Sequence, residues 1–105
     1  MILPIKRKWF DMILSGEKKE EYREIKPYYT TRFKNLWQGS LIGGEAKRKI
    51  MFRNGYSKNS PSFVAECTLS VGTGKPEWGA VPNERYFVLK ILWVKNDGTT
   101  TRSSI

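Results

Sequence analysis

A lysine, a glutamate and an arginine lie close together in the segment GEKKEEYR, residues 16–23. In an extended strand, Glu21 and Arg23 would share one face, about 6–7 Å apart along the strand. A carboxylate in this position can orient the guanidinium fork toward a phosphate or a base edge. An ordinary surface ion pair, worth well under about 1 kcal/mol, is the alternative for the same spacing.

Lys18 adds a titratable amine to this pair, just after Gly16. In a partly desolvated cleft beside Arg23, the pKa of Lys18 is expected to fall, so that the amine can act as an acid or a base. Without burial, Lys18 is expected to contact a phosphate. One hypothesis is a ribonuclease in which Glu21 takes the 2′-hydroxyl proton while Lys18 and Arg23 stabilise the phosphorane. Lys18 and Glu21 are therefore the candidate catalytic residues.

The chain contains no histidine. This excludes Ser-His-Asp and Cys-His catalysis and nearly every catalytic zinc site. Its one cysteine, Cys67, rules out an internal disulfide, and its apolar surroundings, FVAECTLSV, favour a small core residue. Clustered ligands are missing from the sequence, so we expect neither a metal nor an organic cofactor. Cytoplasmic residence is the expectation for a chain with this cysteine content.

The net charge of +9 is concentrated in one half of the chain. Residues 1–53 hold 13 Lys and Arg against 6 Asp and Glu, a net of +7, whereas residues 54–105 have a net of +2. A basic half with interleaved aromatic residues is typical of proteins that bind nucleic acid. The length predicts one domain over 1–105, with 99–105 as a frayed tail. No signal peptide and no membrane span are expected.

Aromatic residues near the charged segment can stack on bases of single-stranded RNA. Tyr22, Tyr28 and Tyr29 are candidates, whereas the helical spacing of Trp37 from Phe33 favours the core. The residues expected to contact nucleic acid are Lys18, Arg23, Lys26, Tyr28, Tyr29 and Trp78. A second basic patch is either a solvated face or a track for a phosphate backbone; it consists of Lys47, Arg48, Lys49 and Arg53. Glu66 either faces outward or points toward Lys18 and Arg23.

In the N-terminal half, the apolar segment ILPI predicts a first strand. The stripe of Ile5, Trp9 and Ile13 predicts an amphipathic helix over 5–15, and Gly16 is suited to end it in a left-handed conformation. Residues 18–25 lose the helical period and read as a strand before Pro27. A threonine cap, Phe33 with Trp37, and the terminal Gly39 predict a second helix over 30–39.

The rest of the chain reads mostly as strands, over residues 46–53, 62–71 and 86–95. Asn54-Gly55 predicts a tight hairpin after the first, and Asp97-Gly98 predicts another turn. The last of the three strands is apolar on both faces, which predicts a central position in the sheet. Residues 72–85 contain several Gly and Pro residues and predict a loop. The fold class is therefore α+β, a small mixed or barrel-like sheet with two helices near the N-terminus.

The segment GEKKEEYR fits the G-x-K-x-x-E-x-R signature of the ASCH domain through Gly16, Lys18, Glu21 and Arg23. An apolar helix runs into the glycine, and KPYY follows at 26–29. Ala65-Glu66, Trp78-Gly79-Ala80 and the strand YFVLKI resemble the rest of that pattern, so the resemblance spans roughly Leu3 to Val94.

This resemblance to ASCH domains implies a PUA-like β-barrel, mixed and mostly antiparallel, with a cleft lined by the signature. It implies binding of RNA or a nucleotide, with the RNA expected to be single-stranded. One branch of the family consists of amidohydrolases acting on acetylated cytidine, and they place a threonine where this sequence has Glu21. The alternative to a binding domain is thus a histidine-independent hydrolase, either a ribonuclease or a nucleoside amidohydrolase. A protein-interaction module is a third class.

Overall fold

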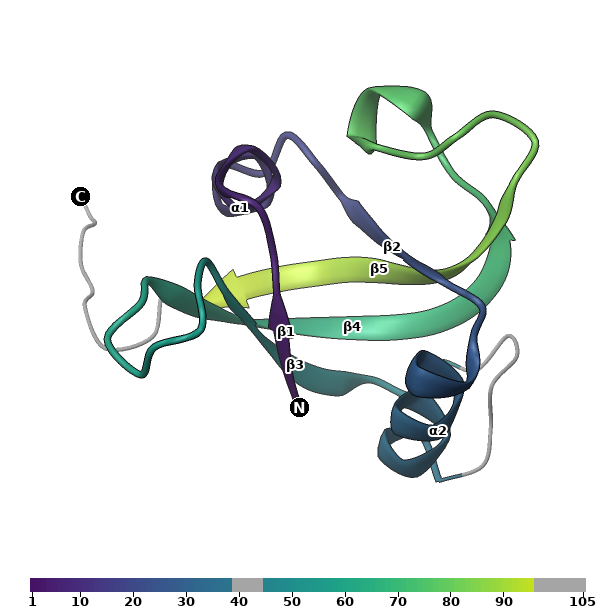
Figure 1. Ribbon diagram of the computed structural model, residues 1–105, viewed down its shortest axis with the longest axis horizontal. Helices are drawn as coiled ribbons and strands as arrows, with labels where there is room; N and C mark the ends of the chain where they lie inside the picture. The colour runs from purple at the N-terminus through teal and green to yellow at the C-terminus, as the bar shows by residue number, and fades with distance from the viewer. Residues whose placement is uncertain (39–44, 96–105) are drawn as a thin grey trace.

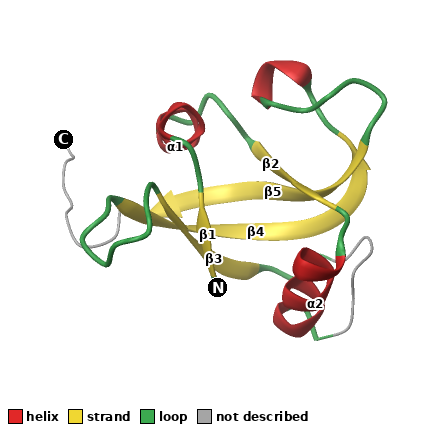
Figure 2. Cartoon of the chain, in the orientation of Figure 1, coloured by secondary structure: helices red, strands yellow, loops and turns green. Residues whose placement is uncertain are grey.

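The computed structural model describes residues 1–38 and 45–95, which form an α+β fold (Figures 1 and 2). Both α-helices lie in the N-terminal half, as the sequence predicts. The elements are, in chain order, β1 (Ile2–Pro4), α1 (Arg7–Leu14), β2 (Glu20–Glu24), α2 (Pro27–Leu36), β3 (Arg48–Arg53), β4 (Ser62–Thr73), the 3-10 turn η1 (Pro76–Trp78) and β5 (Arg85–Lys95).

The strands form one five-stranded mixed sheet in the order β1-β3-β4-β5-β2. β1 pairs with β3 in parallel, whereas the other neighbours pair antiparallel. The sheet curls into a half-barrel, so that β1 and β2, which are its two edges, come to the same side (Figure 1). β5 is an internal strand as predicted, but β4 rather than β5 occupies the middle position.

The half-barrel encloses a core made by alternating strand residues and by aromatic residues of the helices. Ile50 and Phe52 of β3 and Phe63 and Ala65 of β4 are 0% exposed. Phe10 of α1 packs on Phe63, and Phe33 of α2 packs edge-on against Phe87 of β5. The period-two burial along β3 and β4 leaves their other side chains on the outer face of the sheet.

Helix α1 ends as the sequence predicts. Phe10 and Ile13 are buried, and the Gly16 backbone has φ 89°, which a glycine adopts without the steric cost of a side chain. The amide of Gly16 donates to the carbonyl of Ile13 at 3.0 Å, and the amide of Lys18 donates to that of Met12 at 2.9 Å. These bonds turn the chain sharply from the helix into β2.

Helix α2 begins earlier than predicted, at Pro27 instead of Thr30. Pro27 occupies the first helical turn, where its fixed φ is favourable and its missing N–H costs no intrahelical bond. The prediction treated this proline only as the end of a strand, and it thus placed Tyr28 and Tyr29 outside the helix. Trp37 is in the core, as expected, and its indole N–H donates to the carbonyl of Ala46 at 2.9 Å.

The predicted tight hairpin at Asn54-Gly55 is wrong. Arg53 pairs with Ser62, so an eight-residue loop over 54–61 joins β3 to β4. Asn54 has no positive φ, which a type I′ turn would require, and its amide instead donates to the carbonyl of Pro61 at 2.9 Å. Beyond it, the 72–85 segment contains a turn of 3-10 helix, and β4 extends to Thr73.

The predictions for Gly39, for the Asp97-Gly98 turn and for a tail over 99–105 lie outside the described residues. Within the described ranges, no helix is both long and apolar enough to cross a membrane.

Candidate functional site

Strand β2 presents Glu21 and Arg23 from one edge of the half-barrel. It pairs antiparallel with β5, and Glu21 lies opposite Leu89, a fully buried residue. Glu21 therefore points inward, and its carboxylate reaches the barrel interior with only 8% of the side chain exposed. Arg23, two residues further, shares this face as the sequence predicted, and Lys18 enters the same region from the turn after α1.

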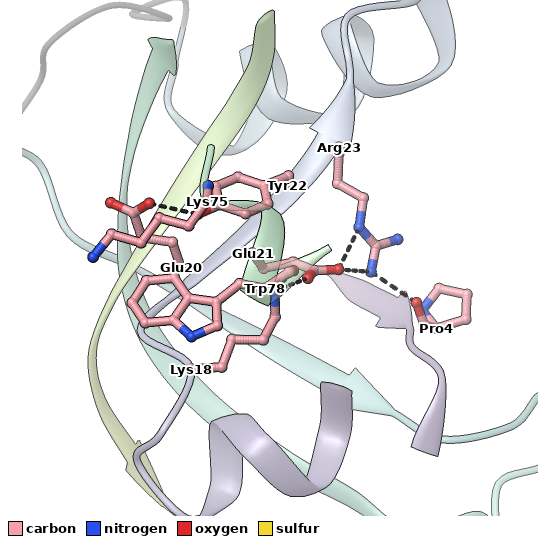
Figure 3. A network of polar contacts seen from close by, with 8 residues as sticks. All are labelled: Pro4, Lys18, Glu20, Glu21, Tyr22, Arg23, Lys75 and Trp78. Atoms are coloured by element: carbon pink, nitrogen blue, oxygen red, sulfur yellow. Dashed lines mark hydrogen bonds and ion pairs between the residues drawn. The ribbon is translucent and has the colours of Figure 1, made fainter. Parts of the chain in front are cut away.

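Each oxygen of the Glu21 carboxylate pairs with a different cation (Figure 3). Oε1 lies 3.2 Å from the Lys18 Nζ. Oε2 accepts hydrogen bonds from Arg23 Nε at 2.9 Å and from Nη2 at 2.6 Å. We call Lys18, Glu21 and Arg23 the buried ion cluster; its carboxylate holds two charges that would otherwise be buried without a counterion.

The Lys18 side chain is fully enclosed, with 0% exposed. Its ammonium donates to the backbone carbonyl of Trp78 at 2.5 Å and lies 4.9 Å and 5.0 Å from the ring centroids of Trp9 and Tyr22. Burial lowers the pKa of Lys18, and the attraction of Glu21 opposes this shift only in part. The sequence predicted a lowered pKa for Lys18, but it did not predict that the ammonium would be enclosed and out of reach of the surface.

Arg23 connects the two edges of the sheet. Nη2 donates to the carbonyl of Pro4 in β1 at 2.9 Å, and Nη1 donates to the Tyr29 hydroxyl at 3.1 Å. Burial acts to lower the pKa of Arg23, but Glu21 and Tyr29 outweigh it, so that the pKa is raised and the guanidinium stays charged. The guanidinium plane is thus fixed by groups from β1, β2 and α2.

An open pocket of about 420 Å³ lies beside this guanidinium. We call it the Arg23 pocket; its lining residues are Pro4, Ile5, Arg23, Tyr29, Asn54, Gly55 and Tyr56. Nη1 carries two hydrogens and makes one bond to a described residue, so one N–H is left for a ligand. The Tyr29 hydroxyl accepts from Arg23 and keeps its own hydrogen to donate. The ring of Tyr56 is 90% exposed at the rim.

Other predicted binding residues are distributed more widely. Lys26 is half-exposed and lies 3.1 Å from Glu24, and Tyr28 is half-exposed with the Arg32 guanidinium 3.6 Å from its ring centroid. Neither lines the Arg23 pocket. Trp78 is half-buried, and its backbone carbonyl, rather than its ring, contacts Lys18. Both nevertheless lie next to Tyr29: the Lys26 Nζ is 5.6 Å from its ring centroid, and the Tyr28 ring packs edge-on against it with centroids 5.0 Å apart. The structure therefore brings together Lys18, Glu21, Arg23 and Tyr29, with Lys26 and Tyr28 adjacent to Tyr29 but outside the Arg23 pocket.

Glu66 lies on the outer face of β4, on the other side of the sheet from the site. The Glu66 carboxylate accepts a hydrogen bond from the indole N–H of Trp93 at 2.8 Å, so of the two orientations left open it takes the outward one. Cys67, the next residue, is a buried core residue as expected, and burial raises the pKa of its thiol to about 12.

The residues of the second basic patch do not share one environment. The Arg48 guanidinium donates to the carbonyl of Leu36 in α2, whereas the Lys49 side chain is exposed.

Four contributors to the site were not foreseen from the sequence. The helix stripe explains Trp9 without a contact to Lys18, Pro4 acts through its carbonyl, the hairpin prediction concerns Asn54 with Gly55, and the sequence makes no prediction for Tyr56. Asn54 Nδ2 donates to the carbonyl of Ile5 at 2.9 Å, which holds the 54–61 loop against the chain after β1. The loop length that places Tyr56 at the pocket has no local sequence signal.

Within residues 1–38 and 45–95, no group of three or more His, Cys, Asp or Glu side chains is arranged to hold a metal ion. Comparisons of the chain with protein-family models, with curated proteins and with solved structures gave no match.

Proposed function

We propose that this chain is an ASCH-type, PUA-like domain that binds a nucleotide or single-stranded RNA through an anionic group held at Arg23. The observation that carries the proposal is the fixed Arg23 fork at the wall of an open pocket of about 420 Å³, whose Nη1 keeps one hydrogen without an acceptor among the described residues. A guanidinium prepared in this way binds phosphate with little loss of side-chain entropy.

The surroundings of Arg23 support a nucleotide more than a simple anion. The exposed Tyr56 adds a ring face on which a base can stack, and the Tyr29 hydroxyl adds a donor. The net charge of +9 favours a polyanionic partner. Lys18 and Glu21 act behind Arg23 in this proposal, because Glu21 orients the fork and Lys18 neutralises the second oxygen of Glu21.

The test is a titration with uridine monophosphate and with a fluorescein-labelled oligouridylate of about twelve nucleotides, at about 50 and 200 mM NaCl. Replacing Arg23 with Lys keeps the charge but removes the fork, so we expect about tenfold weaker binding. Arg7→Lys is the matched control, because Arg7 is exposed and its one ion pair with a described residue is to Asp11 on the helix surface. Binding that is indifferent to salt, or equal in the two variants, would refute the proposal.

Tyr56→Ala provides a second variant in case Arg23→Lys is unstable. Tyr56 is 90% exposed, so its loss should not affect folding, and we expect binding weaker by about fivefold or more if a base stacks on it. Val81→Ala is the control, since this residue is 56% exposed and lies outside the Arg23 pocket.

A hydrolase in the same cleft is the second candidate, and the lowered pKa of Lys18 beside a carboxylate favours it. A neutral amine at this position can accept a proton, provided that the Trp78 turn moves to admit a substrate. Incubation with RNA and with acylated cytidine tests this candidate. Products formed by the native chain and lost in Lys18→Met would support it, whereas products that survive the substitution would indicate a contaminant.

A further inference from the structure

The outer face of the sheet carries an aromatic and basic row that the Arg23 pocket does not use. Lys49 of β3 lies opposite Glu66 of β4, and Glu66 lies opposite Trp93 of β5. Their inward-facing neighbours Ile50 and Ala65 are 0% exposed, so this row points away from the core.

A β-bulge brings a second lysine onto the same face. The register shifts between Glu66 and Cys67, which places Lys90 opposite Thr68 and Trp93 opposite Glu66. Because Thr68 and Glu66 are two residues apart on β4, their partners share a face although they are three apart on β5. Lys95, two residues after Trp93, is exposed on this face as well. We call Lys49, Glu66, Lys90, Trp93 and Lys95 the outer-sheet surface.

The Trp93 ring is both exposed and fixed in orientation. It is 39% exposed, and its indole N–H is held by the Glu66 carboxylate at 2.8 Å. The Lys49 ammonium lies 5.9 Å from the ring centroid, at a distance that suits a cation–π contact.

We infer that the outer-sheet surface is a second contact site for single-stranded nucleic acid, with a base stacked on Trp93 and phosphates held by the surrounding lysines. Charge selects this occupant: Lys49, Lys90 and Lys95 outnumber the acidic residues of the same rows, which are Glu66 and Glu20 opposite Lys90. Exposed lysines are depleted at protein interfaces, whereas an aromatic ring among basic residues is the usual platform for an unpaired strand. The inference extends the proposed function to longer ligands but does not need the Arg23 pocket.

The experiment measures fluorescence anisotropy of the labelled oligouridylate with four forms of the full chain. We expect Trp93→Ala to weaken binding by about 5- to 150-fold and Trp93→Phe, which keeps a stacking face, by less. Leu92→Ala is the matched control, because Leu92 is 40% exposed, adjacent in sequence and offers no ring. Thermal unfolding of each variant shows whether the fold is kept. A Trp93→Ala chain that binds like the native chain, or a Leu92→Ala chain that loses as much, overturns the inference.

Two further variants test the charges of this surface. Lys49→Ala should lower the steepness of the salt dependence by about 0.7, the value for one phosphate contact on a single strand. Glu66→Gln keeps an oxygen for the Trp93 N–H but removes a negative charge, so binding should tighten, and more so at low salt. A purely structural role for Glu66 would instead leave the salt dependence unchanged, and this result would contradict the inference.

Uridine monophosphate separates this inference from the proposed function, because a mononucleotide is too short to occupy both sites. Binding of the mononucleotide that Trp93→Ala leaves intact, together with weaker binding of the oligonucleotide, supports both. If the mononucleotide does not bind but the oligonucleotide depends on Trp93, the outer-sheet surface stands and the Arg23 pocket fails. If the mononucleotide binds and Trp93→Ala does not change oligonucleotide binding, the Arg23 pocket is supported and the outer-sheet surface is refuted.

Discussion

The buried ion cluster and the outer-sheet surface each place a glutamate between a lysine and a second N–H donor, but the glutamate is buried in the first and only partly buried in the second. Glu21 is 8% exposed and accepts from two cations, one of which is 0% exposed. Glu66 lies on the outer face and accepts from the neutral indole of Trp93, with Lys49 opposite it and exposed.

The difference shows how burial decides what a carboxylate does. Inside the half-barrel, desolvation makes each charge depend on the other two, so Glu21 fixes the structure around Arg23. On the outer face, water screens Glu66, so the same functional group orients the Trp93 side chain and contributes little to stability. The following substitutions test this contrast, from the largest expected effect to the smallest.

Replacing Glu21 with Gln should have the largest effect on stability. It leaves Lys18 and Arg23 as two buried cations without an anion, so we expect the free energy of unfolding to fall by about 3–5 kcal/mol. Urea unfolding followed by tryptophan fluorescence and circular dichroism measures this loss. A loss below about 1 kcal/mol would mean that water reaches the cluster and that the contrast with Glu66 does not hold.

Replacing Lys18 with Met should cost less, about 1–3 kcal/mol, because Arg23 still pairs with Glu21 while the Trp78 carbonyl loses its donor. The pH dependence gives an independent readout. Since burial lowers the pKa of folded Lys18 below 10.5, the unfolded chain binds more protons between the two pKa values. The native chain should therefore gain stability relative to Lys18→Met as the pH rises through that interval toward 10.5. A constant difference between the two chains would contradict the lowered pKa.

Replacing Gly79 with Ala tests how Lys18 is covered. Gly79 has φ 104°, and an added Cβ would lie 3.1 Å from the Trp9 ring that packs over the Lys18 ammonium. Gly16→Ala is the matched control, because Gly16 has φ 89° but open space around the added atom. We expect each to lose about 1–2 kcal/mol from backbone strain, and Gly79→Ala to lose roughly 1 kcal/mol more from the contact. Equal losses would show that the Trp9 ring moves freely.

Replacing Glu66 with Gln should have the smallest effect on stability, within about 0.5 kcal/mol. The amide oxygen can still accept from Trp93, and the lost charge is on a solvated face. The same urea titration that is used for Glu21→Gln applies here. A loss comparable to that of Glu21→Gln would show that the outer face depends on its carboxylate as much as the interior does.

Local chemistry was enough to predict much of the fold. The apolar stripe and Gly16 predicted where α1 ends, and strand alternation placed Glu21 and Arg23 on one face of β2. Pro27 was misread because a proline disfavours helix in the residue before it, yet is favourable as the first residue of the next helix. The Asn54-Gly55 dipeptide predicted a tight turn, but the Asn54 side chain bonds Ile5 instead.

The candidate site was predictable only in part, because its members meet through long-range pairing. The enclosure of Lys18 depends on the Trp78 carbonyl, sixty residues away in sequence, and no local pattern encodes that contact. The bond between Glu66 and Trp93 depends on a bulge whose position sets the register of β4 against β5. A sequence pattern gives the face of a strand but not the register of its partner.

The bond from Arg23 to the Pro4 carbonyl joins the two ends of an otherwise open sheet. A ligand that accepts the remaining Nη1 hydrogen should therefore also stabilise β1, which lies at the other edge of the sheet from Arg23. The amide of Ile5, the residue after β1, donates to the Arg53 carbonyl at 2.9 Å and can report this effect. Slower hydrogen exchange at Ile5 on ligand binding would show that a ligand in the pocket lowers local opening at the end of the first strand, although it binds a residue of the opposite sheet edge.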